Sequence, residues 1–129
     1  MYITKILYST VESPTRGIYI EFHVGSEIVR LDHIEDIEFV RQPVHSSFAQ
    51  QQGLVGQVYY DTWKFRSEQD IISIFITDGM TQGVLEHGPR RIVIELQSTF
   101  KSILSGVYDA LQFHFDVEDS YDDDKENEP

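Results

Sequence analysis

Short stretches rich in β-branched and aromatic residues recur along most of this chain, and in the most regular of them apolar residues have the period of two of half-buried β-strands. The clearest example is the segment 18–24, in which every second residue is apolar: Ile18, Ile20, Phe22 and Val24. Further stretches rich in β-branched or aromatic residues are expected to be strands: 2–9, 28–31, 37–42, 58–65, 71–77 and 92–96. Helical spacing is confined to residues 98–111, where Ser98 or Thr99 can cap a helix. Parallel sheets need a helix between consecutive strands, so the sheet is predicted to be largely antiparallel.

The predicted fold class is α+β and mainly β, an antiparallel barrel or sandwich of six to eight strands with one late helix at about residues 98–111. The almost wholly apolar segments 71–77 and 92–96 are expected to be central strands. Residues 111–117 return to a period of two and either form a last strand or extend the helix. Many strands followed by one C-terminal helix resemble a pleckstrin-homology-like barrel, which is the alternative architecture.

Two further segments lack a regular apolar pattern. Residues 43–56 are expected to form the longest loop of the body, and loops of this length are often functional or disordered. The stretch bracketed by Gly83 and Gly88 is expected to be irregular because glycine favours turns.

Charge divides the chain into two parts. The whole chain of 129 residues has a net charge of −12, and residues 116–129 contain eight acidic residues and one lysine, a net charge of −7. Residues 1–117 are predicted to form a single strand-rich globular domain, since one domain of this size can bury a sufficient core. Residues 118–129 are predicted to be a disordered acidic tail, because so polar a segment cannot offset its ordering entropy.

The absence of cysteine narrows the chemistry of the chain. It excludes a disulfide scaffold, a thiolate zinc site, an iron–sulfur centre and a cysteine nucleophile, and it favours a reducing compartment. The first residues lack the apolar run of a signal peptide, and no segment approaches about 20 apolar residues. The expected location is cytoplasmic, which means the host cytoplasm if the chain is viral, with the nucleus as an alternative.

Sequence signatures of catalysis and cofactor binding are missing. None of the phosphate-binding, metalloprotease or nucleophile-elbow patterns occurs. The five histidines lack metal-ligand spacing: His23, His33, His45, His87 and His114. We therefore predict no catalytic residue, no metal ligand and no cofactor. A triad assembled only by folding would escape this search, so an enzyme of unrecognised type stays an alternative.

Candidate binding residues come from three features. The first is a local group of carboxylates, the second is the 43–56 loop with an aromatic strand after it, and the third is the acidic tail. Tyrosine and tryptophan are enriched at interface hot spots, and carboxylates attract basic surfaces. The candidates are Glu35, Asp36, Glu38, His45, Tyr59, Trp63, Asp122, Asp123 and Asp124.

The leading functional prediction is a non-enzymatic protein-binding module that acts as a small acidic inhibitor. It would occupy the basic, nucleic-acid-facing surface of a target protein, because carboxylates can imitate phosphates. In size, charge and lack of cysteine the chain resembles immunity proteins and phage-encoded inhibitors. Direct binding to nucleic acid or to anionic membranes is disfavoured by the acidic balance. The alternative is a structural or assembly subunit of a larger cellular or viral complex, and the sequence leaves the oligomeric state open.

Overall fold

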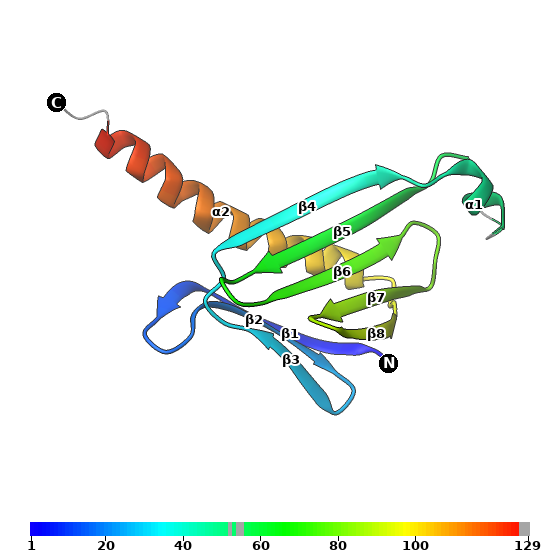
Figure 1. Cartoon of the computed structure of the whole chain (residues 1–129), viewed down its shortest axis with the longest axis horizontal. Coiled ribbons are helices and arrows are strands. Elements are labelled where there is room, and N and C mark those ends of the chain that lie inside the picture. Colours follow the sequence, from blue (N-terminus) through cyan, green and yellow to red (C-terminus); the bar gives the residue numbers. More distant parts are fainter. Residues whose placement is uncertain (52, 54–55, 127–129) are drawn as a thin grey trace.

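A computed structural model describes residues 1–51, 53 and 56–126 of the chain (Figure 1). Within these residues eight strands and two helices follow one another: β1 (Ile3–Ser13), β2 (Gly17–Val24), β3 (Glu27–Leu31), β4 (Asp36–Pro43), α1 (Ser46–Gln51), β5 (Tyr59–Arg66), β6 (Ile71–Thr77), β7 (Gln82–His87), β8 (Arg90–Glu95) and α2 (Phe100–Glu126).

The strands form two antiparallel sheets. One has three strands in the order β1-β2-β3, and the other has five in the order β4-β5-β6-β7-β8. Within each sheet every strand pairs with its neighbour in sequence, as tight turns between short strands allow, whereas β3 and β4 belong to different sheets. The sheets of the described residues do not close into a barrel. The mainly β class and its sandwich form are therefore confirmed, whereas the barrel forms, including the pleckstrin-homology-like one, are not.

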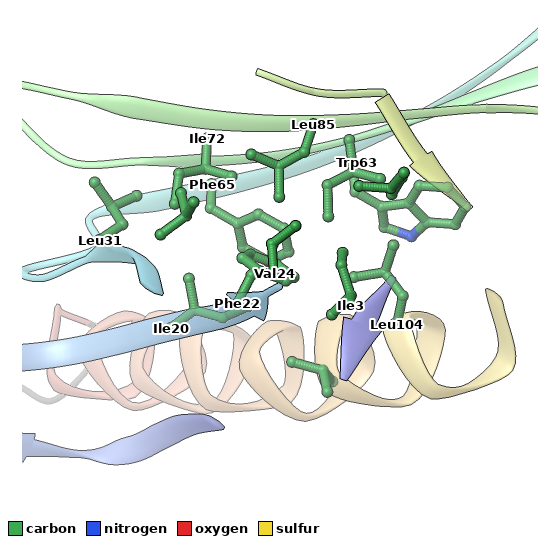
Figure 2. Close-up of a cluster of buried hydrophobic side chains, with 14 of the residues drawn as sticks. Ile3, Ile20, Phe22, Val24, Leu31, Trp63, Phe65, Ile72, Leu85 and Leu104 are labelled. Atoms are coloured by element: carbon green, nitrogen blue, oxygen red, sulfur yellow. The ribbon is translucent and has the colours of Figure 1, made fainter. Parts of the chain in front are cut away.

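One hydrophobic core lies between the two sheets and α2. Figure 2 shows Phe22 of β2 beside Phe65 of β5, and their rings meet edge to face at 6.1 Å. Helix α2 contacts the edge strands β1 and β4. It contributes four buried side chains to the core: Phe100, Leu104, Val107 and Leu111. Each fully buried apolar side chain of this kind stabilises the fold by about 1.5–3 kcal/mol, so α2 is a core element.

Strand β7 occupies the stretch that was expected to be irregular, so that prediction is wrong. Gly83 lies within strand β7. A larger residue would not fit there, because a Cβ at this position would lie 2.8 Å from the Phe75 carbonyl oxygen. Glycine marks the close approach of two backbones in this case and does not mark a turn.

Strand β8 is an edge strand, so the prediction of a central strand at 92–96 is also wrong. Ile92 and Ile94 point into the core, whereas Val93 faces outward and is exposed. The prediction of a central strand holds for β6, which lies between β5 and β7. In the expected loop at 43–56, the short helix α1 is present.

Helix α2 begins as predicted but continues far beyond residue 111. Residues 111–117 extend the helix and form no strand, because Leu111 and Phe115, one turn apart, both pack against the core. No helix in the described part of the chain is long and apolar enough to cross a bilayer.

The tail predicted at 118–129 falls largely in the last part of α2. The helical backbone reaches Glu126, and residues 127–129 lie outside the described residues. The boundary at residue 117 and the disorder of the tail stay predictions.

Candidate functional site

The predicted acidic group lies where the two sheets are joined. Glu35 is exposed in the turn between β3 and β4, and Asp36 and Glu38 project from the same face of the edge strand β4. Arg66 on the neighbouring strand β5 bridges these two carboxylates, at 3.2 Å from Asp36 and 3.1 Å from Glu38. The structure therefore keeps the three acids together but partly neutralises two of them.

Glu35 also lines an open groove of about 340 Å³ between the β3–β4 turn and the β5–β6 turn. Three more carboxylates line it: Asp32, Glu68 and Asp70. Among the described residues, Asp32 and Asp70 have basic partners, whereas Glu35 and Glu68 form no ion pair. The groove thus presents two unpaired carboxylates from separate turns, a pattern that suits a Lys or Arg side chain.

The other predicted residues do not join this group. Tyr59 pairs with Pro43 at one end of the β4–β5 ladder, whereas Asp36 pairs with Arg66 at the other end. At about 3.3 Å per residue the two ends are about 23 Å apart. Tyr59 is half-buried beneath the Arg41 guanidinium, which lies 4.4 Å from its ring.

Two further candidates have roles within the fold. Trp63 is only 2% exposed and packs against Phe39, with ring centroids 5.0 Å apart. We therefore remove Trp63 from the candidate contact residues, because its face of β5 points into the core. His45 is exposed, and its Nδ1 accepts a hydrogen bond from the Ser47 backbone N–H at 3.2 Å, at the start of α1.

The remaining candidates, Asp122, Asp123 and Asp124, lie in the last turns of α2. Their side chains are outside the described part of the structure, so their role as contact residues stays a prediction.

A buried charge cluster escaped the search for binding residues. Asp61 on β5 is 0% exposed, on the same face as Trp63. Its carboxylate accepts two hydrogen bonds from Arg41 Nη1, at 3.1 and 2.8 Å, and lies 2.5 Å from Lys101 Nζ. Both cations also contact Asp78, at 2.8 Å from Arg41 and 2.7 Å from Lys101. The cluster joins β4, β5, the β6–β7 turn and the first turn of α2.

The pKa shifts of Lys101 and Asp78 favour the charged form of each group. Burial opposes the charged form of Lys101, but hydrogen bonds to Asp61 and Asp78 outweigh it and raise the lysine pKa. Burial likewise opposes ionisation of Asp78, but the hydrogen bond from Lys101 outweighs it and lowers the aspartate pKa. General acid–base catalysis needs a pKa near the working pH. The pKa of Lys101 is raised and that of Asp78 is lowered, so both move away from neutral pH. The ion pairs of Lys101 with Asp61 and Asp78 connect the first turn of α2 to the sheet.

The sequence did carry one signal of this cluster. Asp61 lies two residues from Tyr59 and from Trp63, so in a strand these side chains share one face. Asp61 is therefore a charged residue on the most aromatic face of its strand. A charge in such a position is buried with a partner or lies at a turn. Its partners were not recognisable, because Arg41 and Lys101 come from distant segments.

The pH dependence of stability gives a first prediction. The folded-state pKa values of Asp78, Glu21 and Asp32 are lowered, and each owes this to hydrogen bonds from basic side chains that outweigh burial. Carboxylates with depressed pKa values stabilise the fold above their unfolded pKa of about 4, and this contribution is lost as the pH falls. In urea unfolding, the free energy should change little between about pH 7 and 5 and fall below about pH 4.

The variant Asp78→Asn isolates one of these carboxylates. We expect it to lower the free energy of unfolding at neutral pH and to reduce the loss between neutral and acid pH, because its titrating group is gone. An unchanged difference between the two pH values would contradict the contribution of Asp78.

The outer face of the five-stranded sheet is a second open surface. A row of mostly apolar residues crosses it from edge to edge: Val40, Thr62, Phe75, Val84 and Val93. Tyr60 stacks on Phe75 at 5.9 Å, beside a shallow groove of about 490 Å³. No described element covers this face, which leaves it available for protein contact.

Potential metal ligands do not gather anywhere in the described residues, where no three His, Asp or Glu side chains converge as metal ligands would. Comparison with known proteins supplies no relative from which a site could be transferred: no protein family, curated protein or solved structure matches this chain.

Proposed function

We propose that this chain is a non-enzymatic protein-binding module, a small acidic inhibitor that occupies the basic, nucleic-acid-facing surface of a target protein. One observation carries the proposal. Of the ten basic residues in the chain, six form ion pairs with its own carboxylates: Arg16, Arg30, Arg41, Arg66, Arg90 and Lys101. Most of the positive charge is thus neutralised by ion pairs within the fold.

The negative charge is left facing outward. Several exposed carboxylates form no ion pair with a described basic side chain: Glu12, Glu35, Glu68, Asp109 and Asp116. A surface of this kind repels phosphate backbones and steers basic partners toward itself, with fast, salt-sensitive association. The groove at Glu35 and Glu68 is the part of the sheet body best shaped to receive a basic side chain.

Two further features support a binding role over an enzymatic one. The charged forms of Lys101 and Asp78 are favoured in the buried charge cluster. The candidate acids Glu35, Asp36 and Glu38 belong to a turn and an edge strand, where partners have access. A chain without cysteine also fits an inhibitor that works in a reducing compartment such as the cytoplasm.

Salt dependence tests this function. The target is captured from the native host on the immobilised chain, purified, and titrated calorimetrically at 50 and 500 mM NaCl. We expect affinity to weaken by about tenfold or more at the higher salt, because exposed charges are screened. We also expect nucleic acid to compete for the captured target. An affinity that is flat across this range would sink the electrostatic mechanism.

Charge-neutral variants locate the contact. Glu35→Gln combined with Glu68→Gln should weaken binding by roughly three- to tenfold, as expected for exposed ion pairs. Glu12→Gln is the control, because it removes an exposed carboxylate that lies outside the groove. Equal effects of the groove variant and the control would mean that net charge alone drives binding.

A further inference from the structure

Helix α2 carries a second apolar face that the fold leaves uncovered. Its residues, here called the outer stripe, are Ile103, Gly106, Ala110, Phe113 and Val117. Ile103 is 52% exposed, Phe113 is 71% exposed and Val117 is 48% exposed. The spacing alternates between three and four residues, which is the a/d spacing of a helix that packs along another helix.

The outer stripe is separate from the face of α2 that packs on the core. The core face contains Leu104, Val107 and Leu111, which are all buried. At 3.6 residues per turn, the two faces are roughly 110° apart around the helix axis. A helix that is apolar on two faces is typical of a helix packed on both sides, and here only one side is covered. Ile103 belongs to the uncovered side, although it is next in sequence to the buried Leu104.

Small residues form a notch in the middle of the outer stripe. Gly106 and Ala110 lie one turn apart, between the large side chains of Ile103 and Phe113. A Cβ added at Gly106 would meet no heavy atom within 4 Å, so nothing in the fold requires glycine there. Glycine in a helix interior costs about 1 kcal/mol relative to alanine. Close approach of a second helix at the notch is a physical reason for this residue.

The charges around the outer stripe select a basic occupant. Asp109 and Asp116 flank it on one side, and both are exposed. From residue 109 to residue 126 the sequence of α2 holds eight acidic residues and one lysine, a net charge of −7. Acidic residues at a helix C-terminus oppose the macrodipole, and like charges one turn apart repel each other. A basic partner would relieve both penalties, whereas a second copy of this chain would add the same negative charge.

We propose that the outer stripe, residues 103–117, is the docking surface for a basic amphipathic helix of the target protein. Apolar side chains of that helix pack between Ile103 and Phe113, its backbone approaches at Gly106, and its Lys and Arg side chains reach the two aspartates that flank the stripe. This is helix-in-groove recognition with charge complementarity, and it rests on the proposed function. Figure 1 shows the C-terminal part of α2 extending beyond both sheets.

A designed peptide tests the inference directly. The probe is a synthetic helix of about three heptads with Leu and Ala at a and d and Lys or Arg at e and g, and its control carries Glu at e and g. Fluorescence anisotropy with the full chain should show binding of the basic peptide and not of the acidic one. Phe113→Ser combined with Val117→Ser should weaken binding by about tenfold or more, as for central interface anchors.

Two variants separate docking from folding. Gly106→Gln fills the notch in open space, so we expect weaker peptide binding with an unchanged or higher melting temperature. Val11→Ser changes an exposed apolar residue on β1, far from the outer stripe in sequence, and should leave peptide binding unchanged.

The possible outcomes distinguish the inference from the proposed function. In one outcome, capture of the target depends on salt and yet does not change in the outer-stripe variants. This result would overturn the docking surface but not the inhibitor function. Capture that is insensitive to salt would overturn the inhibitor function itself. Failure of the basic peptide to bind, or equal binding of the acidic peptide, would overturn the docking proposal. So would a sedimenting dimer of the free chain that Phe113→Ser dissociates, because the occupant would then be a second copy.

Discussion

Replacing Arg41 and Lys101 together by methionine should destabilise the domain by about 3–5 kcal/mol, the cost of leaving a buried carboxylate without its partner. Asp61 is 0% exposed, and these two cations are its ion-pair partners among the described side chains. Each single variant should cost less than the double variant, because the other cation still contacts the carboxylate. The midpoint of urea unfolding measures the difference, since it falls in proportion to the lost stability.

A rescue variant shows whether the buried charge is the cause. Adding Asp61→Asn to the double variant should recover much of the lost stability, because a neutral amide is easier to bury than an unpaired carboxylate. Arg66→Met is the matched surface control, since it removes an arginine that bridges two carboxylates at the surface, and it should cost about 1 kcal/mol or less. Equal losses from the surface control and the double variant would contradict a buried-charge mechanism.

Leu104→Ala should cost about 2–5 kcal/mol, whereas Ile103→Ala, one residue away, should change stability by less than about 1 kcal/mol. Leu104 is fully buried between α2 and the sheets, as Figure 2 shows, and its truncation leaves a cavity. Ile103 faces outward, and alanine is the better helix former. Thermal or urea unfolding of the two variants makes the comparison.

The same pair of variants tests the outer stripe without any partner. Equal losses at the two positions would mean that α2 is covered on both sides in the isolated chain, for example by a second copy.

Deleting residues 118–129 tests whether the acidic end of the chain contributes to stability. We expect it to change the free energy of unfolding by less than about 0.5 kcal/mol, because a segment with so few apolar residues contributes little hydrophobic stabilisation.

Local patterns accounted for most of the strands. The alternation at 18–24 depends on residues close in sequence, and the structure has β2 and its two hairpins there. Strand β7 was not predicted, because Gly83 and Gly88 indicated an irregular stretch there. Gly83 is a strand residue owing to contact with the Phe75 backbone, and that contact exists only after β6 and β7 have paired.

Only part of the candidate site was predictable from the sequence, because some of its residues come together only when distant segments pack. Glu35, Asp36 and Glu38 are neighbours in sequence, so their proximity followed from the sequence. The second wall of the groove, with Glu68, comes from the turn between two other strands. Local patterns cannot place Trp63 either, because both faces of β5 carry aromatic rings and only tertiary packing determines which face is buried.

By itself, the sequence determined that the chain is a mainly β domain with antiparallel hairpins, one C-terminal helix and an acidic end, since periodicity and charge are properties of neighbouring residues. The tertiary structure decided which face of each element is covered. It placed Asp61 beside two cations from distant segments, and it left the outer stripe of α2 open although the stripe contains Ile103, Phe113 and Val117. Burial depends on what lies across from a side chain, and that is settled only when elements far apart in the sequence pack together.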